Sequence, residues 1–116
     1  MLYILLIGAA LNFSGAAKLA FEFFRLGEQA AAEHRQLKLF VMGVATVFGA
    51  LYLYLFAHPQ FIDPFLWFGA ALKAWAFITC LYLKLTGRID RKLFLEFGLT
   101  NGVVAVMFVM LLINLT

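Results

Sequence analysis

Residues 65–85 read FLWFGAALKAWAFITCLYLKL, and this stretch decides how the rest of the chain is interpreted. A helix of about 20 apolar residues crosses the hydrocarbon core of a bilayer. The stretch has that length, but Lys73 stands near its middle. An ammonium group at the bilayer centre costs at least about 2.5–3.5 kcal/mol by insertion scales, so other groups must offset it. The sequence therefore predicts a helix bundle in which Lys73 is turned away from lipid.

The composition of the whole chain is that of a membrane protein. Of its 116 residues, 66% are hydrophobic and 13% are charged. Soluble domains average about 45–50% apolar and about 25% charged residues. The length has room for one domain, which we place over residues 1–116. The net charge of +3 does not indicate nucleic-acid binding, because the basic residues are distributed by membrane side.

Four apolar segments predict four transmembrane helices. They cover about residues 2–21, 39–57, 65–85 and 93–115. None of them alternates polar and apolar residues with the period of two that is typical of a strand. The predicted fold class is therefore an all-α membrane protein, a four-transmembrane-helix bundle whose helices run up, down, up and down.

The connectors have the residues expected between such helices. Residues 29–38 contain strong helix formers, which predicts a helical extension or a short surface helix. Pro59 and Pro64 bracket a turn. Gly87 suits a helix C-terminus, and Asp90 suits the N-cap of the helix that follows.

The basic residues predict the orientation in the membrane. Four crossings place the first and third connectors on one side, and eight of the nine Lys and Arg residues lie there: Lys18, Arg25, Arg35, Lys38, Lys84, Arg88, Arg91 and Lys92. By the positive-inside rule these connectors are cytoplasmic, in an inner (plasma) membrane, and both termini are extracytoplasmic. The bias argues against a transporter that inserts in both orientations, because such proteins need nearly balanced flanking charges.

Each segment carries a polar residue near the bilayer midplane, at a rise of about 1.5 Å per residue. These four residues are Asn12, Thr46, Lys73 and Asn101. Lys18 and Glu96 lie nearer the cytoplasm at similar depths, so we expect them to pair. Together the six are our candidates for a ligand site or an ion path. Two interpretations of Lys73 stay open: a structural amine held by Asn and carbonyl oxygens, or an amine that contacts an anion, a carbonyl ligand or a proton path.

Small residues accompany the polar ones, which is typical of the helix–helix side of a membrane helix. Lys73 shares its face with Gly69, Ala70 and Cys80, among others. The patterns Gly98-x-x-x-Gly102 and Ala45-x-x-x-Gly49 permit close approach of backbones. The first of these patterns fits either packing inside the chain or a dimer seam.

No catalytic, metal or cofactor site is predicted. His34 and His58 lie in connectors, so no pair of mid-membrane histidines can hold a haem. No Ser–His–Asp set, phosphate loop or zinc spacing is present, and the single cysteine, Cys80, has no cysteine partner.

The run LNFSGAAKL at residues 11–19 resembles the first-helix Gly-x-x-Lys-Leu pattern of DoxX-like membrane proteins. VFGALYLYL at residues 47–55 is similar to the Gly-rich second helix of that group. The resemblance maps onto Gly15, Lys18 and Leu19. It implies a small inner-membrane subunit with an accessory role, associated with redox or thiol metabolism.

Three functions from different classes follow. The first is a non-catalytic component that docks on a larger membrane complex or binds a small amphipathic molecule between its helices. The second is an oligomeric, fixed-orientation transporter or channel that uses Lys73 with Lys18 and Glu96. An enzyme that uses Lys73 or Glu96 as acid or base is the third and weakest. The expected partners are the lipid bilayer, further copies of the chain or a larger complex, and a small amphipathic or anionic ligand, but no nucleic acid.

Overall fold

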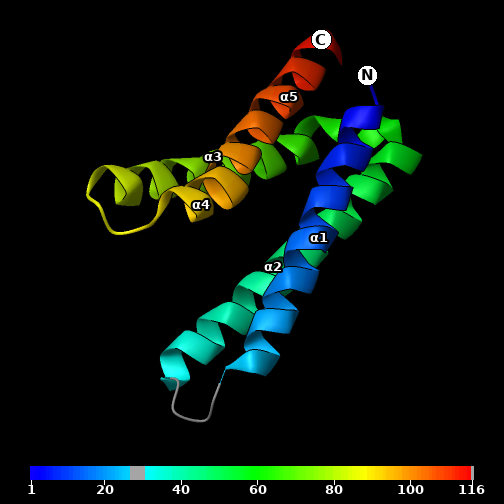
Figure 1. Cartoon of the computed structure of the whole chain (residues 1–116). Helices are drawn as coiled ribbons and strands as arrows, with labels where there is room; N and C mark the ends of the chain where they lie inside the picture. The colour runs from blue at the N-terminus through cyan, green and yellow to red at the C-terminus, as the bar shows by residue number, and fades with distance from the viewer. Residues whose placement is uncertain (27–30, 116) are drawn as a thin grey trace. The chain divides into compact units, whose positions relative to one another are not determined.

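The structure, a computed structural model, describes residues 1–26 and 31–115, which are almost wholly helical (Figure 1). No strand occurs within these ranges. Four helices are long and apolar enough to cross a membrane: Tyr3–Arg25, Ala32–Ala57, Pro59–Leu85 and Arg91–Leu115. The four apolar segments predicted from the sequence are therefore confirmed as helices.

The first two helices are longer than predicted. Helix α1 (Tyr3–Arg25) continues past residue 21, and α2 (Ala32–Ala57) begins well before residue 39. The predicted bounds followed hydrophobicity, whereas a helix continues as long as its residues favour it. An ion pair between Lys38 Nζ and Glu22 Oε2, at 3.2 Å, joins the two extensions. The helical extension predicted for residues 29–38 is confirmed from Ala32 onward; residues 29–30 lie outside the described residues.

The connector before α3 (Ile62–Leu85) is a short 3₁₀ turn, η1 (Pro59–Phe61). Asp63 interrupts the start of α3 with φ −95° and ψ 122°, because a residue before proline is disfavoured in the α region. The uninterrupted helix thus starts at Pro64, one residue before the predicted boundary at 65.

The other end of α3 forms the predicted turn. Gly87 has φ +73°, the left-handed conformation that glycine adopts without strain. The Arg88 N–H donates to the Leu83 carbonyl and the Gly87 N–H to the Lys84 carbonyl, the two bonds of a Schellman motif. Asp90 then caps the next helix, because its Oδ1 accepts from the Leu93 N–H at 2.8 Å. Both sequence predictions for this turn are confirmed.

The fourth segment is not one regular α-helix. It begins as α4 (Arg91–Leu93), continues as a π-helix, η2 (Phe94–Leu99), and ends as α5 (Thr100–Leu115). The prediction of a single helix over residues 93–115 is corrected by this π segment. Two backbone carbonyls of the π-helix accept hydrogen bonds from side chains: Thr100 Oγ1 donates to the Glu96 carbonyl at 2.7 Å, and Asn101 Nδ2 donates to the Phe97 carbonyl at 2.6 Å.

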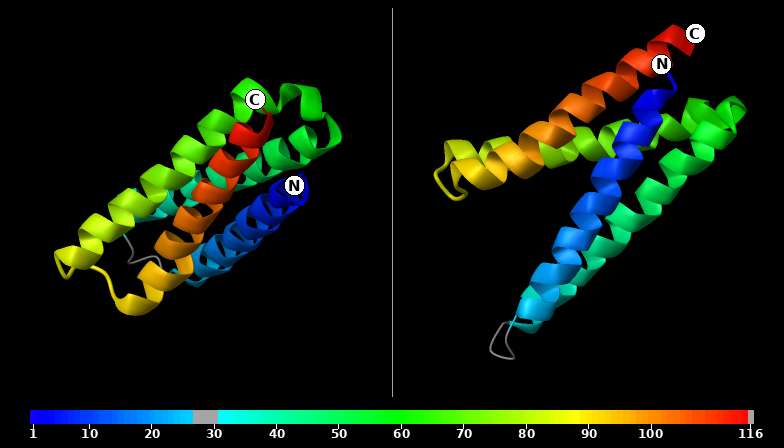
Figure 2. Two further views of the ribbon diagram at one scale, coloured as in Figure 1. Left: turned by 90° about the horizontal axis from the view of Figure 1, so that it is seen from above. Right: turned by 45° about the vertical axis from the view of Figure 1, so that its right-hand side comes forward.

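The contacts divide the chain into two compact units. One unit covers Leu5–Ala57, where α1 and α2 lie side by side and run in opposite directions (Figure 2). The other unit joins Met1–Ile4 with His58–Thr116, and in it η2 and α5 run back along α3. The single domain expected over residues 1–116 stays a prediction.

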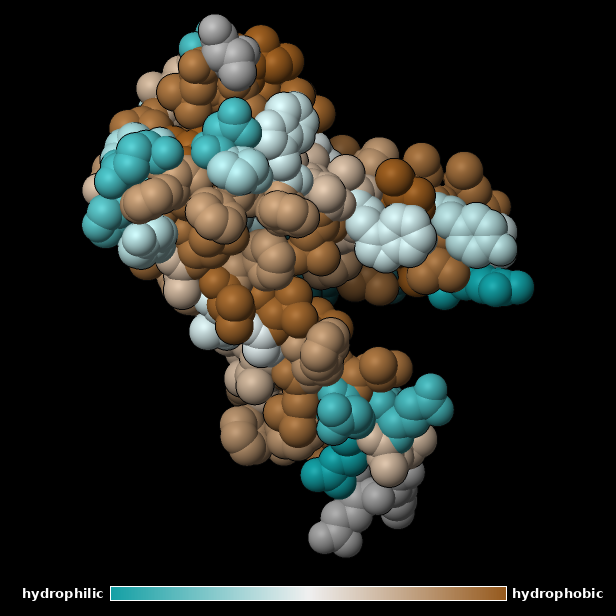
Figure 3. Space-filling model, turned by 180° about the vertical axis from the view of Figure 1, so that it is seen from behind, coloured by the Kyte–Doolittle hydropathy of each residue, from teal (hydrophilic) through white to brown (hydrophobic). Residues whose placement is uncertain are grey.

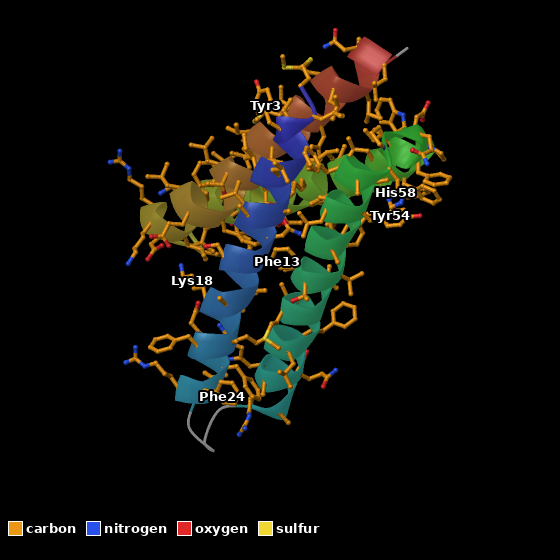
Figure 4. All side chains as sticks on the ribbon, turned by 90° about the vertical axis from the view of Figure 1, so that its right-hand side faces the viewer. Tyr3, Phe13, Lys18, Phe24, Tyr54 and His58 are labelled. Carbon is orange, nitrogen blue, oxygen red and sulfur yellow. The ribbon has the colours of Figure 1, made fainter. Side chains whose placement is uncertain are left out.

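Glycines allow close packing within each unit. A Cβ added to Gly98 would lie 2.7 Å from Cys80 Cβ, and one added to Gly102 would lie 2.7 Å from Phe77 Cδ1. The Gly98-x-x-x-Gly102 pattern therefore packs against α3 inside the chain, the first of the two alternatives. In the other unit, a Cβ on Gly49 would lie 3.0 Å from the Phe13 ring, and Figure 4 shows Phe13 on the side of α1 toward α2.

Most of the helical surface is apolar and uncovered. In the most apolar window of each long helix, only 17% to 33% of the residues are buried. Phe24, Leu85 and Phe68 are among the large apolar side chains left exposed. Figure 3 shows hydrophobic surface over most of one face, with hydrophilic residues gathered mainly at its ends. Such a surface is far more apolar than water-soluble monomers present.

Replacing Gly98 with alanine is expected to lower the free energy of unfolding by about 1–3 kcal/mol, the usual cost of overpacking. The added Cβ would press on Cys80 Cβ, which is fixed to the α3 backbone and cannot rotate away. Gly43→Ala is the matched control, because nothing lies within 4 Å of that position. It is expected to keep or raise stability. Unfolding by sodium dodecyl sulfate in mixed micelles, followed by circular dichroism, measures both; equal stabilities would contradict the packing described.

Candidate functional site

Lys73 is buried, as the sequence predicts. Its side chain is only 4% exposed. Lys73 Nζ donates a hydrogen bond to Asn101 Oδ1 at 3.1 Å, which links α3 to the first turn of α5. Hydrogen bonds to charged groups contribute about 1.5–3 kcal/mol, and an amine this deep has a large desolvation cost to offset. The pair therefore stabilises the position of α5 on α3.

Asn101 is oriented by the π-helix. Its Nδ2 donates to the Phe97 carbonyl, so Oδ1 is the atom left to face the amine. This assignment agrees with the chemistry, because an ammonium group only donates and needs an oxygen opposite it. The Phe97 carbonyl of the π-helix, the Asn101 amide and the Lys73 amine are thus joined by two consecutive hydrogen bonds, and we call this network the lysine relay.

Gly98 of η2 and Gly102 of α5, which we call the glycine seam, bring the fourth segment close enough to α3 for this bond. Phe77 lies one turn after Lys73 on α3 and packs on Gly102, next to Asn101 in sequence. A further turn along, Cys80 packs on Gly98. A bulkier residue at either glycine would separate the helices and lengthen the bond from Lys73 to Asn101.

Two further candidates, Asn12 and Thr46, belong to the other unit. Asn12 is buried, and its Nδ2 donates to the Ala45 carbonyl at 3.0 Å, which joins α1 to α2. Thr46 is exposed, and its Oγ1 donates to the Met42 carbonyl of its own helix at 2.9 Å. Asn12 therefore bonds across two helices, whereas the bond from Thr46 stays within α2.

Lys18 and Glu96 are both exposed. Figure 4 shows Lys18 extending from the side of α1 opposite α2. Lys18 belongs to the unit of α1 and α2, and Glu96 belongs to the unit of α3 and α5. Their pairing, and a single polar cluster drawn from all four helices, stay predictions.

Two features of the structure were not predicted from the sequence: the pairing of Glu22 with Lys38 and the π-helix around Glu96. A signal for the first was present, because the two residues flank a short connector between antiparallel helices. No periodicity distinguishes a π segment from an α-helix in an apolar run.

The polar side chains of the lysine relay bond to other groups of the same chain. Among the described residues, no group of three or more His, Cys, Asp and Glu side chains is placed to hold a metal ion. The charged group buried in α3, Lys73, is bonded to Asn101, and the cysteine nearby, Cys80, packs on glycine. The fold and this site define a helical protein with four helices that can cross a membrane, one of which buries a lysine. The sequence matches no known family model, no curated protein and no solved structure.

The bond between Lys73 and Asn101 is expected to appear in a double-mutant cycle. Asn101→Leu removes an acceptor of the buried Lys73 amine, so it should lower the free energy of unfolding by about 1.5–3 kcal/mol. Once Lys73→Met has removed the amine, the same change should cost much less. Unfolding in mixed micelles gives the coupling, expected at about 1–3 kcal/mol.

Asn114→Leu serves as the control for this cycle. Asn114 is on the same helix, but its Nδ2 donates to the Met110 carbonyl, far along α5 from Lys73. Its effect should add to that of Lys73→Met within about 0.5 kcal/mol. A coupling between Lys73 and Asn101 no larger than this control would show that the bond does not stabilise the protein.

Proposed function

We propose that the chain is a small multi-pass protein of the inner membrane and a non-catalytic component of a larger membrane complex. Its four long helices form an up-down-up-down bundle, with the basic connectors in the cytoplasm and both termini outside. The DoxX-like resemblance implies the same accessory role and stays a prediction.

One observation carries this proposal: several polar side chains within the apolar helices bond to other groups of the chain itself. Lys73 donates to Asn101, Asn101 to Phe97, and Asn12 to Ala45. Thr79 and Thr100 likewise donate to carbonyls of their own helices. Bonds of this kind hold helices in register and support their backbones. The outer surface, by contrast, is apolar and mostly uncovered, which suits lipid and the helices of a partner.

The alternative is an oligomeric, fixed-orientation transporter or channel that uses Lys73 with Lys18 and Glu96. The burial of Lys73 favours it, because ionisable residues inside membranes commonly mark ion or substrate paths. The two proposals differ in whether the protein moves an ion or a substrate across the bilayer with the help of Lys73.

A flux assay separates these proposals. Wild-type protein and Lys73→Met are reconstituted in liposomes, and proton and chloride fluxes are compared with those of empty vesicles. A component without transport activity should give no added flux in either case. It should also co-purify in fixed stoichiometry with a larger partner when tagged at native expression levels. A flux that Lys73→Met abolishes and Asn114→Leu preserves would overturn the accessory proposal in favour of transport.

The orientation gives a separate prediction, tested by cysteine labelling in a Cys80→Ala background. Gln60→Cys places a thiol in the exposed connector before α3, and Arg88→Cys places one in the exposed connector after it. A membrane-impermeant maleimide should label residue 60 in intact spheroplasts and residue 88 only after permeabilisation. The reverse pattern would show that the topology is inverted. Labelling of both residue 60 and residue 88 in intact spheroplasts would show that α3 does not cross the membrane.

A further inference from the structure

The turn between α3 and α4 concentrates positive charge. Four basic residues lie in this turn or in the helix ends that flank it, and we call them the basic turn: Lys84, Arg88, Arg91 and Lys92. Arg88, Arg91 and Lys92 are exposed, and Lys84 is half-buried in the last turn of α3. The chain's remaining basic residues are spread over a much longer stretch of sequence.

The backbone of the basic turn is fixed by its own hydrogen bonds. The Schellman motif at Gly87 fixes the backbone positions of Lys84 and Arg88 relative to each other. The Asp90 cap fixes the backbone at the start of α4, which carries Arg91 and Lys92. A fixed backbone loses less conformational entropy on binding than a flexible loop does. The four cations are therefore held at one end of the unit before any partner arrives.

The charge of the basic turn is not neutralised by neighbouring side chains. Across residues 1–26 and 31–115, none of the four cations forms an ion pair with a carboxylate. Asp90 is the acidic residue inside the turn, and its Oδ1 accepts from the Leu93 N–H. An anion approaching the turn thus meets several cations and one carboxylate that is already used as a cap.

Apolar side chains border the basic turn directly. Leu85 is 77% exposed and Tyr82 is 60% exposed on the last turns of α3, and Leu93 is exposed on α4. Figure 3 shows hydrophilic surface at the end where α3 and α4 meet, next to apolar surface. A nucleic acid or an acidic soluble protein would leave these apolar side chains in water. A bilayer covers them with acyl chains and places its headgroups at the cations.

We propose that the basic turn binds the headgroups of anionic phospholipids in the cytoplasmic leaflet, with Tyr82 and Leu85 inserted among the adjoining lipids. This inference rests on the proposed membrane topology. Basic residues clustered just cytoplasmic of a transmembrane helix attract anionic lipids, through an interaction that salt screens. The bound lipids would hold the α3–α4 end of the protein at a fixed depth.

Native mass spectrometry of protein released from nanodiscs tests this proposal. The nanodiscs contain phosphatidylcholine and phosphatidylglycerol in a nine-to-one ratio, and the lipids retained on the full-length protein are counted. Phosphatidylglycerol should be enriched roughly threefold or more over its share of the bilayer at 0.1 M ammonium acetate, and much less so at 1 M. The salt comparison uses the wild-type protein, so it does not depend on a variant that folds.

The variant Arg88→Gln/Arg91→Gln should reduce the enrichment to near the bulk share. The matched control, Arg25→Gln/Arg35→Gln, removes the same charge from the ends of α1 and α2 that flank the first connector, where each guanidinium lies over a phenylalanine ring. It should keep the enrichment. Retention at the bulk ratio, or an equal loss in both variants, would overturn the proposed lipid site while leaving the membrane topology intact. A protein that fails to enter nanodiscs at all would instead overturn the topology.

Discussion

The hydrogen bond from Lys73 to Asn101 is the contact on which the arrangement of α3 and α5 depends. An apolar helix can pack on another in many rotations at similar cost, because lipid and a neighbouring leucine are nearly equivalent surroundings. A buried ammonium group removes that freedom, since rotations that expose it to hydrocarbon cost several kcal/mol. The amine therefore selects one face of α3, and Asn101 selects the matching face of α5.

The π-helix and the glycine seam both belong to the fourth segment, and both position Asn101 for its contact with Lys73. The π segment ends just before Asn101, and the Phe97 carbonyl orients the amide so that its oxygen faces Lys73. Gly98 and Gly102 bring the backbone close to Cys80 and Phe77, which keeps the amine within bonding distance. The lysine relay thus depends on residues of two helices, and its hydrogen bond from Lys73 to Asn101 offsets part of the cost of burying an amine in an apolar stretch.

Cations occupy two different settings along α3. Near its middle a cation is buried and bonded to an amide, whereas at and beyond its C-terminal end the backbone that carries the four cations of the basic turn is held by a Schellman motif and a capped helix start. The buried cation contributes specificity to helix packing. In the proposed lipid site the exposed cations face an anionic leaflet, and the hydrogen-bonded backbone keeps them together.

The sequence by itself determined the four apolar helices, the burial of Lys73, and the turn at Gly87 and Asp90. These features depend on hydrophobicity summed along a segment and on the backbone preferences of single residues, which are local properties. The sequence placed Asn12 and Asn101 near the middle of their apolar segments, but it could not identify the groups to which they bond. Only the tertiary structure decided that Asn101 accepts from Lys73, that Gly98 packs on Cys80, and that a π-helix precedes Asn101. Those pairings depend on how two helices are rotated and shifted against each other, and a shift of one residue turns a side chain by about 100°.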